Sequence, residues 1–417
     1  MSETNKSMQW VSALSTEASL ENAVKDVAAQ VNGQLQQAPD FGLVFISAAY
    51  ASEFVRLLPL LHEALSIPCL IGCSGGGIIG TPPASSLAKE EEQRPGLSLC
   101  VGVLPGVTVQ PFTLQEDDLP DLDSPPAAWT ERIGVRAADN PSFILLADPF
   151  SARITELLQG LDFAFPTAVK IGGLAGISGF DRSSGLFFND VMQTEGVVGV
   201  ALTGNIVLDA IVAQGCRPIG RPLRIAASER NILLEVEECD DFGGETQTPL
   251  AALQEILREL DEGDRALAQD SLHVGIAQDG FKEKLQPGDF LIRNLLGVDP
   301  RIGALAIGDR LRLGQRIQFH LRDARTSADD LETLLIRYRS EHKSLASAPI
   351  GALMFACMGR GEGLYQKPNF DSHLFQEFVG NAPVTGFFCG GEIGPVGGTT
   401  FLHGYTSVFG ICRSAQP

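Results

Sequence analysis

Three segments of the chain share one order of hydrophobic and polar positions. They cover residues 43–77, 143–176 and 352–394. Each begins with a short apolar run typical of a buried strand, continues with apolar residues at helical spacing, and returns to an apolar run that ends in a glycine-rich turn. We therefore predict three strand–helix–strand units.

The spacing within these segments indicates a structural repeat. The offset from the first strand to a glycine of the turn is 29 residues in two copies and 34 in the third, namely from Leu43 to Gly72, from Phe143 to Gly172 and from Ala352 to Gly386. Parallel strands joined through a helix need a crossover of about a dozen residues or more, which these offsets allow. Each copy is therefore predicted to be a right-handed βαβ unit.

An apolar segment follows each glycine turn without an intervening helix. These segments are residues 97–104, 196–202 and 405–411. Such short returns favour antiparallel pairing. The predicted fold class is α/β, with mixed sheets built from repeated strand–helix–strand units followed by antiparallel strands, and with helices covering the sheets.

Apolar stripes and caps outline the remaining elements. Leu20, Val24, Val27, Val31 and Leu35 form one stripe, which predicts an N-terminal helix within residues 1–37 that packs on the first domain. The polar stretch 236–248 ends in Thr248–Pro249, a helix cap followed by a first-turn proline. We place a boundary there, which gives a first domain at 38–237 and a second at 248–413.

One strand of the second half carries a histidine. Ile317, Phe319 and Leu321 alternate with polar residues, so the pattern predicts a half-buried strand. His320 falls among the polar positions, and we expect its side chain to be exposed.

Composition excludes several classes of function. The chain has 31 basic and 51 acidic residues and a net charge of −20, which opposes binding to nucleic acid. The first residues, MSETNKSMQW, contain no basic leader before an apolar run, and no segment reaches the roughly 20 apolar residues of a membrane span. We expect a cytoplasmic protein without membrane insertion.

The 8 cysteines are too sparse for a disulfide scaffold and lack zinc-ligand spacing, so we expect reduced thiols and no bound metal.

Two glycine motifs suggest chemistry, but their context weakens both. Gly75, Gly77 and Gly80 satisfy G-x-G-x-x-G, yet two prolines follow where a dinucleotide site needs a helix. Residues 72–76 match G-x-S-x-G, the nucleophile elbow, with Ser74 as the serine. The same missing helix opposes that interpretation. A hydrolase or transferase that uses Ser74 remains an alternative.

A second possible nucleophile is Cys357, at the end of the apolar strand in "FACMGRG". Arg360 follows three residues later and would favour the thiolate. A buried strand cysteine explains the same pattern without chemistry, so both interpretations stay open.

The glycine turns together favour a ligand site. Turns at 72–77, 172–176, 359–363 and 389–394 end predicted strands, and ligands of α/β proteins tend to bind beyond the carboxyl ends of strands. Backbone without side chains exposes amide donors to a ligand. We predict that these turns converge on one pocket for a small polar molecule.

Several motifs together resemble one known family. They are "GCSGGGIIG", "KIGGLAG", "GVVGVAL", "GCRPIGRPLRIAASERNILLEVE", "ALMFACMGRG", "GFFCGGEIGP" and "FLHGYTSVFGI". Over residues 38–413 the chain is similar to the FIST proteins, named for F-box and intracellular signal transduction. The resemblance implies FIST N-terminal and C-terminal domains at 38–237 and 248–413.

The resemblance also implies a function. FIST domains are described as sensors of small molecules such as amino acids, and they accompany or partner signalling proteins such as kinases and cyclases. Some members are haem-dependent nitric-oxide sensors, which leaves haem as an alternative, with His373 and His403 as the available axial residues. We expect a non-enzymatic sensor that reports through protein contact.

We expect nine residues to bind the ligand: Cys73, Ser74, Gly172, Gly173, Cys357, Arg360, Gly361, Glu392 and His403. Cys357 and Glu392 match the family pattern. Arg360 is expected to pair with an acidic group of the ligand and Glu392 with an amine.

Overall fold

The structure of the protein is a computed structural model that describes residues 7–151, 153–176, 184–239, 245–279, 282, 284, 285, 288–343 and 347–415. The chain divides into two compact units. Unit 1 consists of residues 1–212 and 334–417, and unit 2 consists of residues 213–333.

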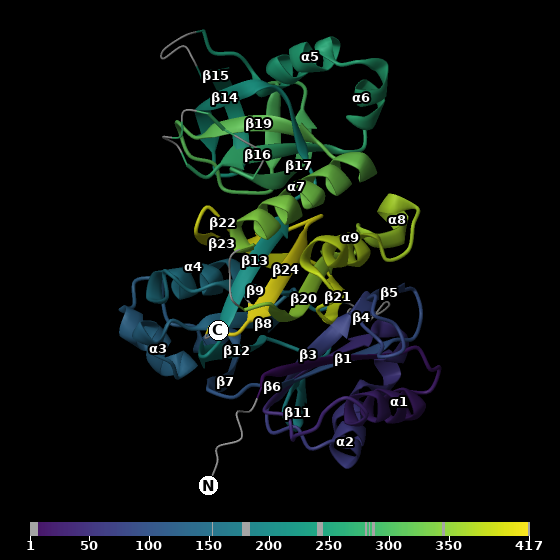
Figure 1. Ribbon diagram of the computed structural model, residues 1–417. Coiled ribbons are helices and arrows are strands. Elements are labelled where there is room, and N and C mark those ends of the chain that lie inside the picture. Colours follow the sequence, from purple (N-terminus) through teal and green to yellow (C-terminus); the bar gives the residue numbers. More distant parts are fainter. Residues whose placement is uncertain are drawn as a thin grey trace. The chain divides into compact units, whose positions relative to one another are not determined.

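Unit 1 repeats one path of helices and strands three times (Figure 1). Copy 1 runs through β1 (Gln9–Ser15), α1 (Leu20–Asn32), β2 (Phe41–Ser47), α2 (Phe54–Ala64), β3 (Leu70–Gly75), β4 (Gly77–Gly80), β5 (Lys89–Glu92) and β6 (Leu97–Val103). Copy 2 runs through β7 (Val107–Leu114), α3 (Pro126–Ile133), β8 (Ser142–Ala147), α4 (Ile154–Ala164), β9 (Lys170–Leu174), β10 (Leu186–Phe188), β11 (Val191–Gln193) and β12 (Val197–Gly204). Short 3-10 helices lie at Ala48–Glu53, Glu116–Asp118 and Ala137–Asp139.

Copy 3 follows the same path with unit 2 inserted after its first strand. It begins with β13 (Val207–Ala213) and resumes with α7 (Ala324–His342), within which the division between the two units falls. It continues through β20 (Pro349–Cys357), α8 (Gly361–Tyr365), α9 (Phe370–Val379), β21 (Val384–Cys389), β22 (Glu392–Val396), β23 (Thr399–His403) and β24 (Ser407–Arg413).

Each copy supplies the first four strands of one six-stranded mixed sheet. The strand orders are β1-β6-β2-β3-β10-β11, β7-β12-β8-β9-β22-β23 and β13-β24-β20-β21-β4-β5. In every sheet the two βαβ strands pair in parallel, and the return strand pairs antiparallel with the first of them. The predicted α/β fold with mixed sheets is confirmed.

The last two strands of each sheet come from a different copy. The hairpin β4–β5 of copy 1 pairs with β21 of copy 3, β10–β11 of copy 2 pairs with β3 of copy 1, and β22–β23 of copy 3 pairs with β9 of copy 2. This exchange is cyclic, so the three copies complete one another's sheets.

The apolar faces of the three sheets meet in a shared core. Phe45 of β2 stacks on Phe387 of β21 at a centroid distance of 4.9 Å, and Ile144 and Leu146 of β8 belong to the same buried cluster. Helices cover the outer faces. In α1 the predicted stripe is buried from Leu20 to Val31 and packs with residues of β2, β6 and α2.

Unit 2 is built around a closed antiparallel barrel. Its strands are β14 (Arg217–Glu229), β15 (Ile232–Glu238), β16 (Leu272–Ala277), β17 (Phe290–Asp299), β18 (Ala304–Ile307) and β19 (Arg316–Leu321), in the order β14-β15-β18-β17-β16-β19. Two helices accompany them, α5 (Pro249–Glu259) and α6 (Glu262–Leu267). The predicted cap is confirmed, because the Thr248 hydroxyl accepts the Ala251 N–H at 3.3 Å.

The barrel bears on two sequence-based expectations. The stretch 236–248, of which 240–244 lie outside the described residues, falls within unit 2, because β15 and β18 from either side of it pair in one sheet. The expected exposure of His320 is wrong: only 2% of its surface is exposed. Its ring lies against Gly275 of β16 and 5.0 Å from the Phe290 ring, so both faces of β19 are covered.

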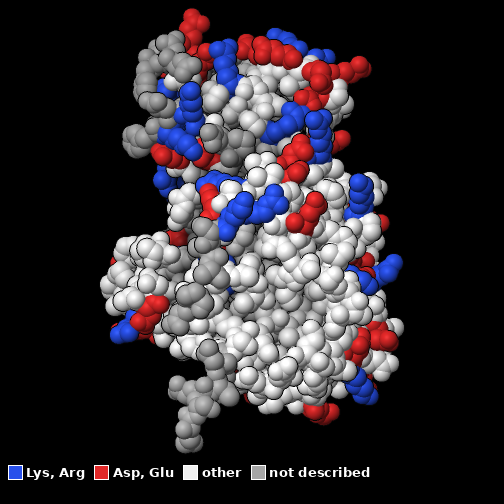
Figure 2. All heavy atoms as spheres, viewed as in Figure 1, with Lys and Arg blue, Asp and Glu red and all other residues white. Residues whose placement is uncertain are grey.

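Charged side chains are unevenly distributed on the face shown in Figure 2. Lys, Arg, Asp and Glu are interspersed over the visible part of unit 2, whereas much of the visible part of unit 1 carries other residues. That face therefore shows no continuous basic surface. In the described part of the chain, no helix is both long enough and apolar enough to cross a membrane.

Candidate functional site

Three glycines at equivalent positions allow the paired strands of each copy to approach. A Cβ on Gly72 would lie 2.0 Å from the carbonyl oxygen of Val44, and the corresponding distances are 1.8 Å for Gly172 and 1.7 Å for Gly386. No side chain fits at such distances. These are the three glycines that the sequence offset relates. Gly172 was expected to bind the ligand, but the space of its missing side chain is filled by the backbone of β8.

The glycine turns of the three copies converge and are joined by hydrogen bonds. The Gly76 N–H of copy 1 donates to the Phe388 carbonyl of copy 3 at 2.9 Å. The other two bonds have the same form: Gly176 of copy 2 donates to Ser74 of copy 1 at 2.7 Å, and Gly390 of copy 3 donates to Leu174 of copy 2 at 3.1 Å. We call this closed cycle of three bonds the corner ring.

The shared core changes from apolar to polar where it meets the corner ring. Phe45, Leu146 and Phe355 lie in the core on β2, β8 and β20. The residues two positions later are Ser47 and Cys357, which end β2 and β20, and Asp148, which directly follows β8. We call these three residues the terminal layer. They lie at the carboxyl ends of the parallel strands, where ligands of α/β proteins tend to bind.

Asp148 organises the turn after β8. Its Oδ2 accepts the N–H groups of Phe150 at 3.0 Å and Ser151 at 2.8 Å, and its Oδ1 accepts the Ser184 hydroxyl at 2.8 Å. The residue is 4% exposed. The Ser151 hydroxyl also donates to Oδ2, at 2.8 Å, so four donors hold the Asp148 carboxylate and fix the turn at the carboxyl end of β8.

The first two predicted ligand residues, Cys73 and Ser74, are fully buried in β3. The Ser74 hydroxyl donates to the Gly176 carbonyl at 2.8 Å and accepts the Gly185 N–H at 2.9 Å, so it joins copy 1 to copy 2. Burial raises the pKa of the Cys73 thiol well above its usual range. Since β4 follows β3 instead of a helix, the structure around Ser74 lacks the geometry of a nucleophile elbow.

The surface of the corner ring is formed mainly by copy 3. Gly390 is exposed, Met358 is 49% exposed, and Cys357 and Tyr405 are half-buried. The Met358 side chain lies against Gly76, because a Cβ there would be 2.4 Å from the Met358 sulfur. These residues would be the first to meet a ligand that approaches the ring.

Arg360 was expected to bind an acidic group of the ligand, but its guanidinium already binds Asp371. Its Nε and Nη2 donate to the two Asp371 oxygens at 2.6 and 3.0 Å, and both side chains are almost fully buried. Nη2 also donates to the Tyr365 hydroxyl at 2.5 Å. This two-point pair connects the turn after β20 to the first turn of α9. Arg360 thus acts as a structural clamp in this structure.

Two carboxylates of copy 1, the buried Glu90 and the half-buried Glu92, reach α9 and α8. Glu90 Oε1 accepts the Ser372 N–H at 2.8 Å, and Glu92 Oε1 accepts the Glu362 N–H at 2.7 Å. Burial, then the nearby Asp371 charge, raises the pKa of Glu90 to about 7. Gly361 has a φ of +64°, and a Cβ on it would lie 2.2 Å from Glu92 Oε1, so this predicted ligand residue instead makes room for the carboxylate.

Glu392 and His403 lie opposite each other on β22 and β23. Glu392 is fully buried, and its Oε2 accepts the Thr406 N–H at 3.0 Å. Its register partner on the other side is Gly173 of β9, whose missing Cβ leaves room for the Cys389 sulfur. Glu392 and Gly173 therefore lie behind the corner ring, at the junction between copies 2 and 3.

The two histidines considered as axial haem ligands each contact a backbone carbonyl through one ring nitrogen. Nε2 of His373 lies 3.0 Å from the Ala88 carbonyl oxygen, and Nε2 of His403 lies 3.0 Å from that of Gly394. A ring nitrogen that donates to a carbonyl carries a proton, so only Nδ1 of each ring would keep a lone pair for iron. Among the described residues, no group of three or more His, Cys, Asp or Glu side chains is arranged to hold a metal ion.

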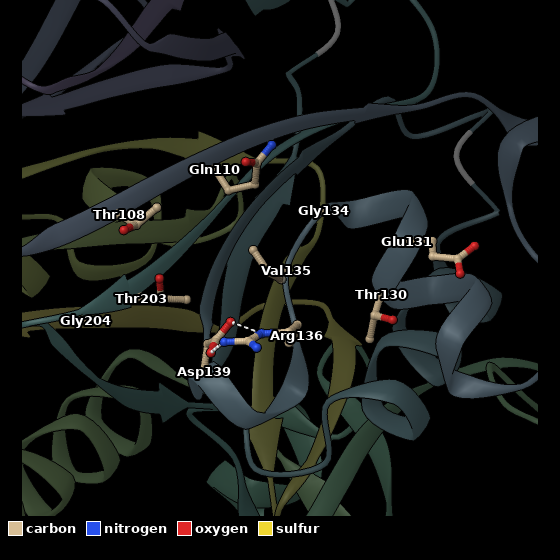
Figure 3. Close-up of a pocket in the computed structure, with 10 residues that line it drawn as sticks. All are labelled: Thr108, Gln110, Thr130, Glu131, Gly134, Val135, Arg136, Asp139, Thr203 and Gly204. Carbon is tan, nitrogen blue, oxygen red and sulfur yellow. Dashed lines mark hydrogen bonds and ion pairs between the residues drawn. The ribbon is translucent and has the colours of Figure 1, made fainter.

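A separate open cleft of about 710 Å³ lies on copy 2 (Figure 3). Its lining comprises Thr108, Gln110, Thr130, Glu131, Gly134, Val135, Arg136, Asp139, Thr203 and Gly204. The Arg136 side chain points toward Asp139 and donates to it at 2.7 and 3.0 Å. Since Asp139 precedes β8, the cleft lies near the amino end of that strand, whereas the corner ring lies at the carboxyl ends.

Sequence reasoning missed Asp148, Asp371 and Glu90. Asp148 could have been found, because it ends the apolar run "FILLAD" at the position that Cys357 occupies in copy 3. Asp371 and Glu90 gave no such signal. Each lies in a polar stretch, and its importance comes from partners far away in the sequence.

Comparisons with known proteins support one family. A model of the FIST N domain matches residues 40–238, and a model of the FIST C domain matches residues 249–395. The chain is 31% identical over 397 residues to an uncharacterized protein of Mycobacterium tuberculosis H37Rv, which covers 94% of this chain and 97% of that protein. An uncharacterized Mycobacterium bovis protein is 31% identical over 388 residues, or 92% of this chain and 94% of that protein.

One solved structure aligns along the whole chain at low similarity. The crystal structure of cyanuric acid hydrolase from A. caulinodans covers 97% of this chain and 99% of its own, with 10% identity and a TM-score of 0.32. A TM-score of that size establishes neither a shared fold nor a shared activity. The two domain matches and the mycobacterial relatives decide the assignment. FIST domains are sensory domains of signal transduction, and this chain belongs to the FIST family.

Proposed function

We propose that this protein is a small-molecule sensor that binds an amino acid or a similar small polar metabolite over the corner ring. The proposal rests mainly on the convergence of three glycine turns in one cycle of hydrogen bonds. Glycine turns whose only role is to end strands need not be hydrogen-bonded to one another. Their meeting point lies at the carboxyl ends of all three pairs of parallel strands.

The chemistry around the corner ring suits a small polar ligand. Apolar core residues give way to the terminal layer of Ser47, Asp148 and Cys357, and Arg360 with Asp371 adds a rigid buried ion pair at the end of β20. Exposed backbone and a few polar side chains at one place favour a small polar ligand over an apolar one. The ligand would contact exposed backbone at Gly390 and the half-buried side chains of Cys357 and Tyr405.

Thermal-shift measurements can test this placement with a panel of the common amino acids and small carboxylic acids. Gly390→Leu is the test variant, because the space around its missing Cβ is open, with only the Ala175 carbonyl at 3.9 Å, and its φ is not left-handed. The new side chain should cover the ring without disturbing the fold. Gly297→Leu is the matched control, since no atom lies within 4 Å of that position in unit 2.

At least one compound should raise the melting temperature of the wild type and of Gly297→Leu, but not that of Gly390→Leu. A ligand at 100 times its Kd adds about 2.7 kcal/mol to the free energy of unfolding. If no compound stabilises the wild type, or if Gly390→Leu responds like the control, the ligand does not bind over the corner ring.

We further propose that the sensor acts by binding, not by catalysis, and reports through contact with a signalling protein such as a kinase or a cyclase. Unit 2 offers a surface for such contact: Leu296, Val298 and Ile302 in and beside the β17–β18 hairpin are 62%, 46% and 59% exposed. Apolar side chains grouped on a surface favour association. Leu296→Asp should weaken ligand-dependent binding of a purified partner and leave the thermal shift unchanged.

A further inference from the structure

Cys357 and Cys389 form a cross-strand pair at the end of copy 3. They are register partners on the parallel strands β20 and β21 and are the last residues of both. They share the core-facing side with Phe355 and Phe387, two positions earlier, whose ring centroids are 5.7 Å apart. Adjacent strands lie about 4.8 Å apart, which is within the Cα separations of disulfides.

The two thiols differ in access to solvent. Cys357 is half-buried beside the exposed residues Met358 and Gly359, and its sulfur accepts the Gly359 N–H at 3.5 Å. Cys389 is fully buried, with its thiol directed at the Phe387 carbonyl 3.8 Å away. One thiol can therefore meet a small oxidant, while the other is protected from it and lies on the adjacent strand.

The surroundings keep the buried partner in its thiol form. Burial, followed by the proximity of Glu392, Cys357 and Cys73, raises the pKa of Cys389 well above its usual range. Since thiolate is the reactive form, Cys389 should not react first with an oxidant. The pair should therefore react in two steps, in which the oxidant first oxidises Cys357 and Cys389 then reacts with the oxidised Cys357.

We propose that Cys357 and Cys389 are a redox-active dithiol that a hydroperoxide converts into a disulfide. The Cys357 thiolate attacks one peroxide oxygen, the O–O bond breaks, and the leaving oxygen takes up a proton, so that hydrogen peroxide gives water and a sulfenic acid on Cys357. The Cys389 sulfur then attacks the Cys357 sulfur, the S–O bond breaks, and a second water leaves with the Cys389 proton. The two thiols lose two electrons in total, and the peroxide gains them.

The disulfide would act directly on the corner ring. Cys389 precedes Gly390, which donates to Leu174, and the Cys389 carbonyl accepts the Met358 N–H at 3.2 Å. A bond between the two sulfurs would draw the ends of β20 and β21 together beneath these contacts. This inference does not depend on a bound metabolite, and its test needs none.

The test treats the folded full-length chain with stoichiometric hydrogen peroxide, blocks remaining thiols by alkylation, and maps the products by non-reducing peptide mass spectrometry. Wild type should give one disulfide-linked peptide joining β20 to β21. Cys389→Ser should instead accumulate a Cys357 sulfenic acid that dimedone traps. Cys357→Ser should lower the rate at which the Cys389 thiol is lost at least tenfold, and near-ultraviolet circular dichroism can verify that each variant is folded.

Two other sets of thiols serve as internal controls. Cys73→Ser should behave like the wild type, because Cys73 is expected to take no part in the linkage. Cys100 and Cys412 are both fully buried and should stay reduced. A Cys357–Cys73 linkage, irreversible oxidation of Cys357 in the wild type without a disulfide, or equal loss of Cys100 would each overturn the proposal.

Discussion

Copies 1 and 3 of unit 1 follow the same path but end in different chemistry. In both, a glycine beneath the turn admits the carbonyl of the paired strand, at Gly72 and at Gly386. In copy 1 the strand β2 ends in Ser47, whose hydroxyl accepts the Gly96 N–H at 3.1 Å, whereas in copy 3 the equivalent strand β20 ends in Cys357. The repeated glycines preserve the architecture, and the residues that vary between copies supply the chemistry.

The largest expected effect comes from a glycine that all three copies need. Gly172→Ala should lower the free energy of unfolding by about 4 kcal/mol or more, because its Cβ would lie 1.8 Å from the Leu145 carbonyl oxygen at a φ of +152°. Gly390→Ala has open space and should change it by less than about 0.5 kcal/mol. Urea unfolding of both variants measures the difference. A similar decrease in the free energy of unfolding for both variants would mean that the tightly packed Gly172 and the exposed Gly390 contribute equally to stability.

The next effect distinguishes copy 3 through its buried ion pair. Asp371→Asn should lower the free energy of unfolding by about 3 kcal/mol, because the charge of a buried Arg360 loses its compensating carboxylate. Asp299→Asn removes the partner of Arg301, which is 86% exposed, and should leave the urea midpoint unchanged. If Asp371→Asn also leaves the urea midpoint unchanged, the Arg360–Asp371 pair does not stabilise the end of β20.

A smaller effect should appear in the pH dependence of Glu90. Its pKa is about 7 in the folded chain against an ordinary value of 4.5, so the folded state holds a proton that the unfolded state releases between these pH values. Stability should therefore fall as the pH rises through this window, by up to about 3 kcal/mol from this group. Urea unfolding from pH 4.5 to 8 should show that the free energy of unfolding of Glu90→Gln rises relative to that of the wild type as the pH rises. A constant difference would contradict this assignment.

The repeat itself could be predicted from the sequence, because strand and helix patterns are local. The offsets from Leu43, Phe143 and Ala352 already related the three glycines that prove equivalent. The hairpin exchange could not be predicted, because pairing between β4 and β21 depends on residues about 300 positions apart, with no local signal. The insertion of unit 2 could not be predicted for the same reason, because strands from both sides of the polar stretch 236–248 pair in its barrel.

For the site, sequence patterns located the turns but not the partners of their side chains. Cys357, Glu392 and the glycine turns do lie near one another, yet Arg360 proved to be bound by Asp371, eleven residues later. His320 shows the same limit, because alternation cannot tell a half-exposed strand from one covered on both faces. Composition and period indicate which residues can be buried, whereas the partner of a buried charge is fixed only by the tertiary fold.

The most direct test of the central claim is backbone amide hydrogen exchange, with and without the compound that gives the largest thermal shift. If the metabolite binds over the corner ring, exchange should slow at Gly76, Met358 and Gly390, which three different turns contribute. Slower exchange confined to Val135, Arg136 and Thr203 would place the ligand in the cleft on copy 2 and contradict the account.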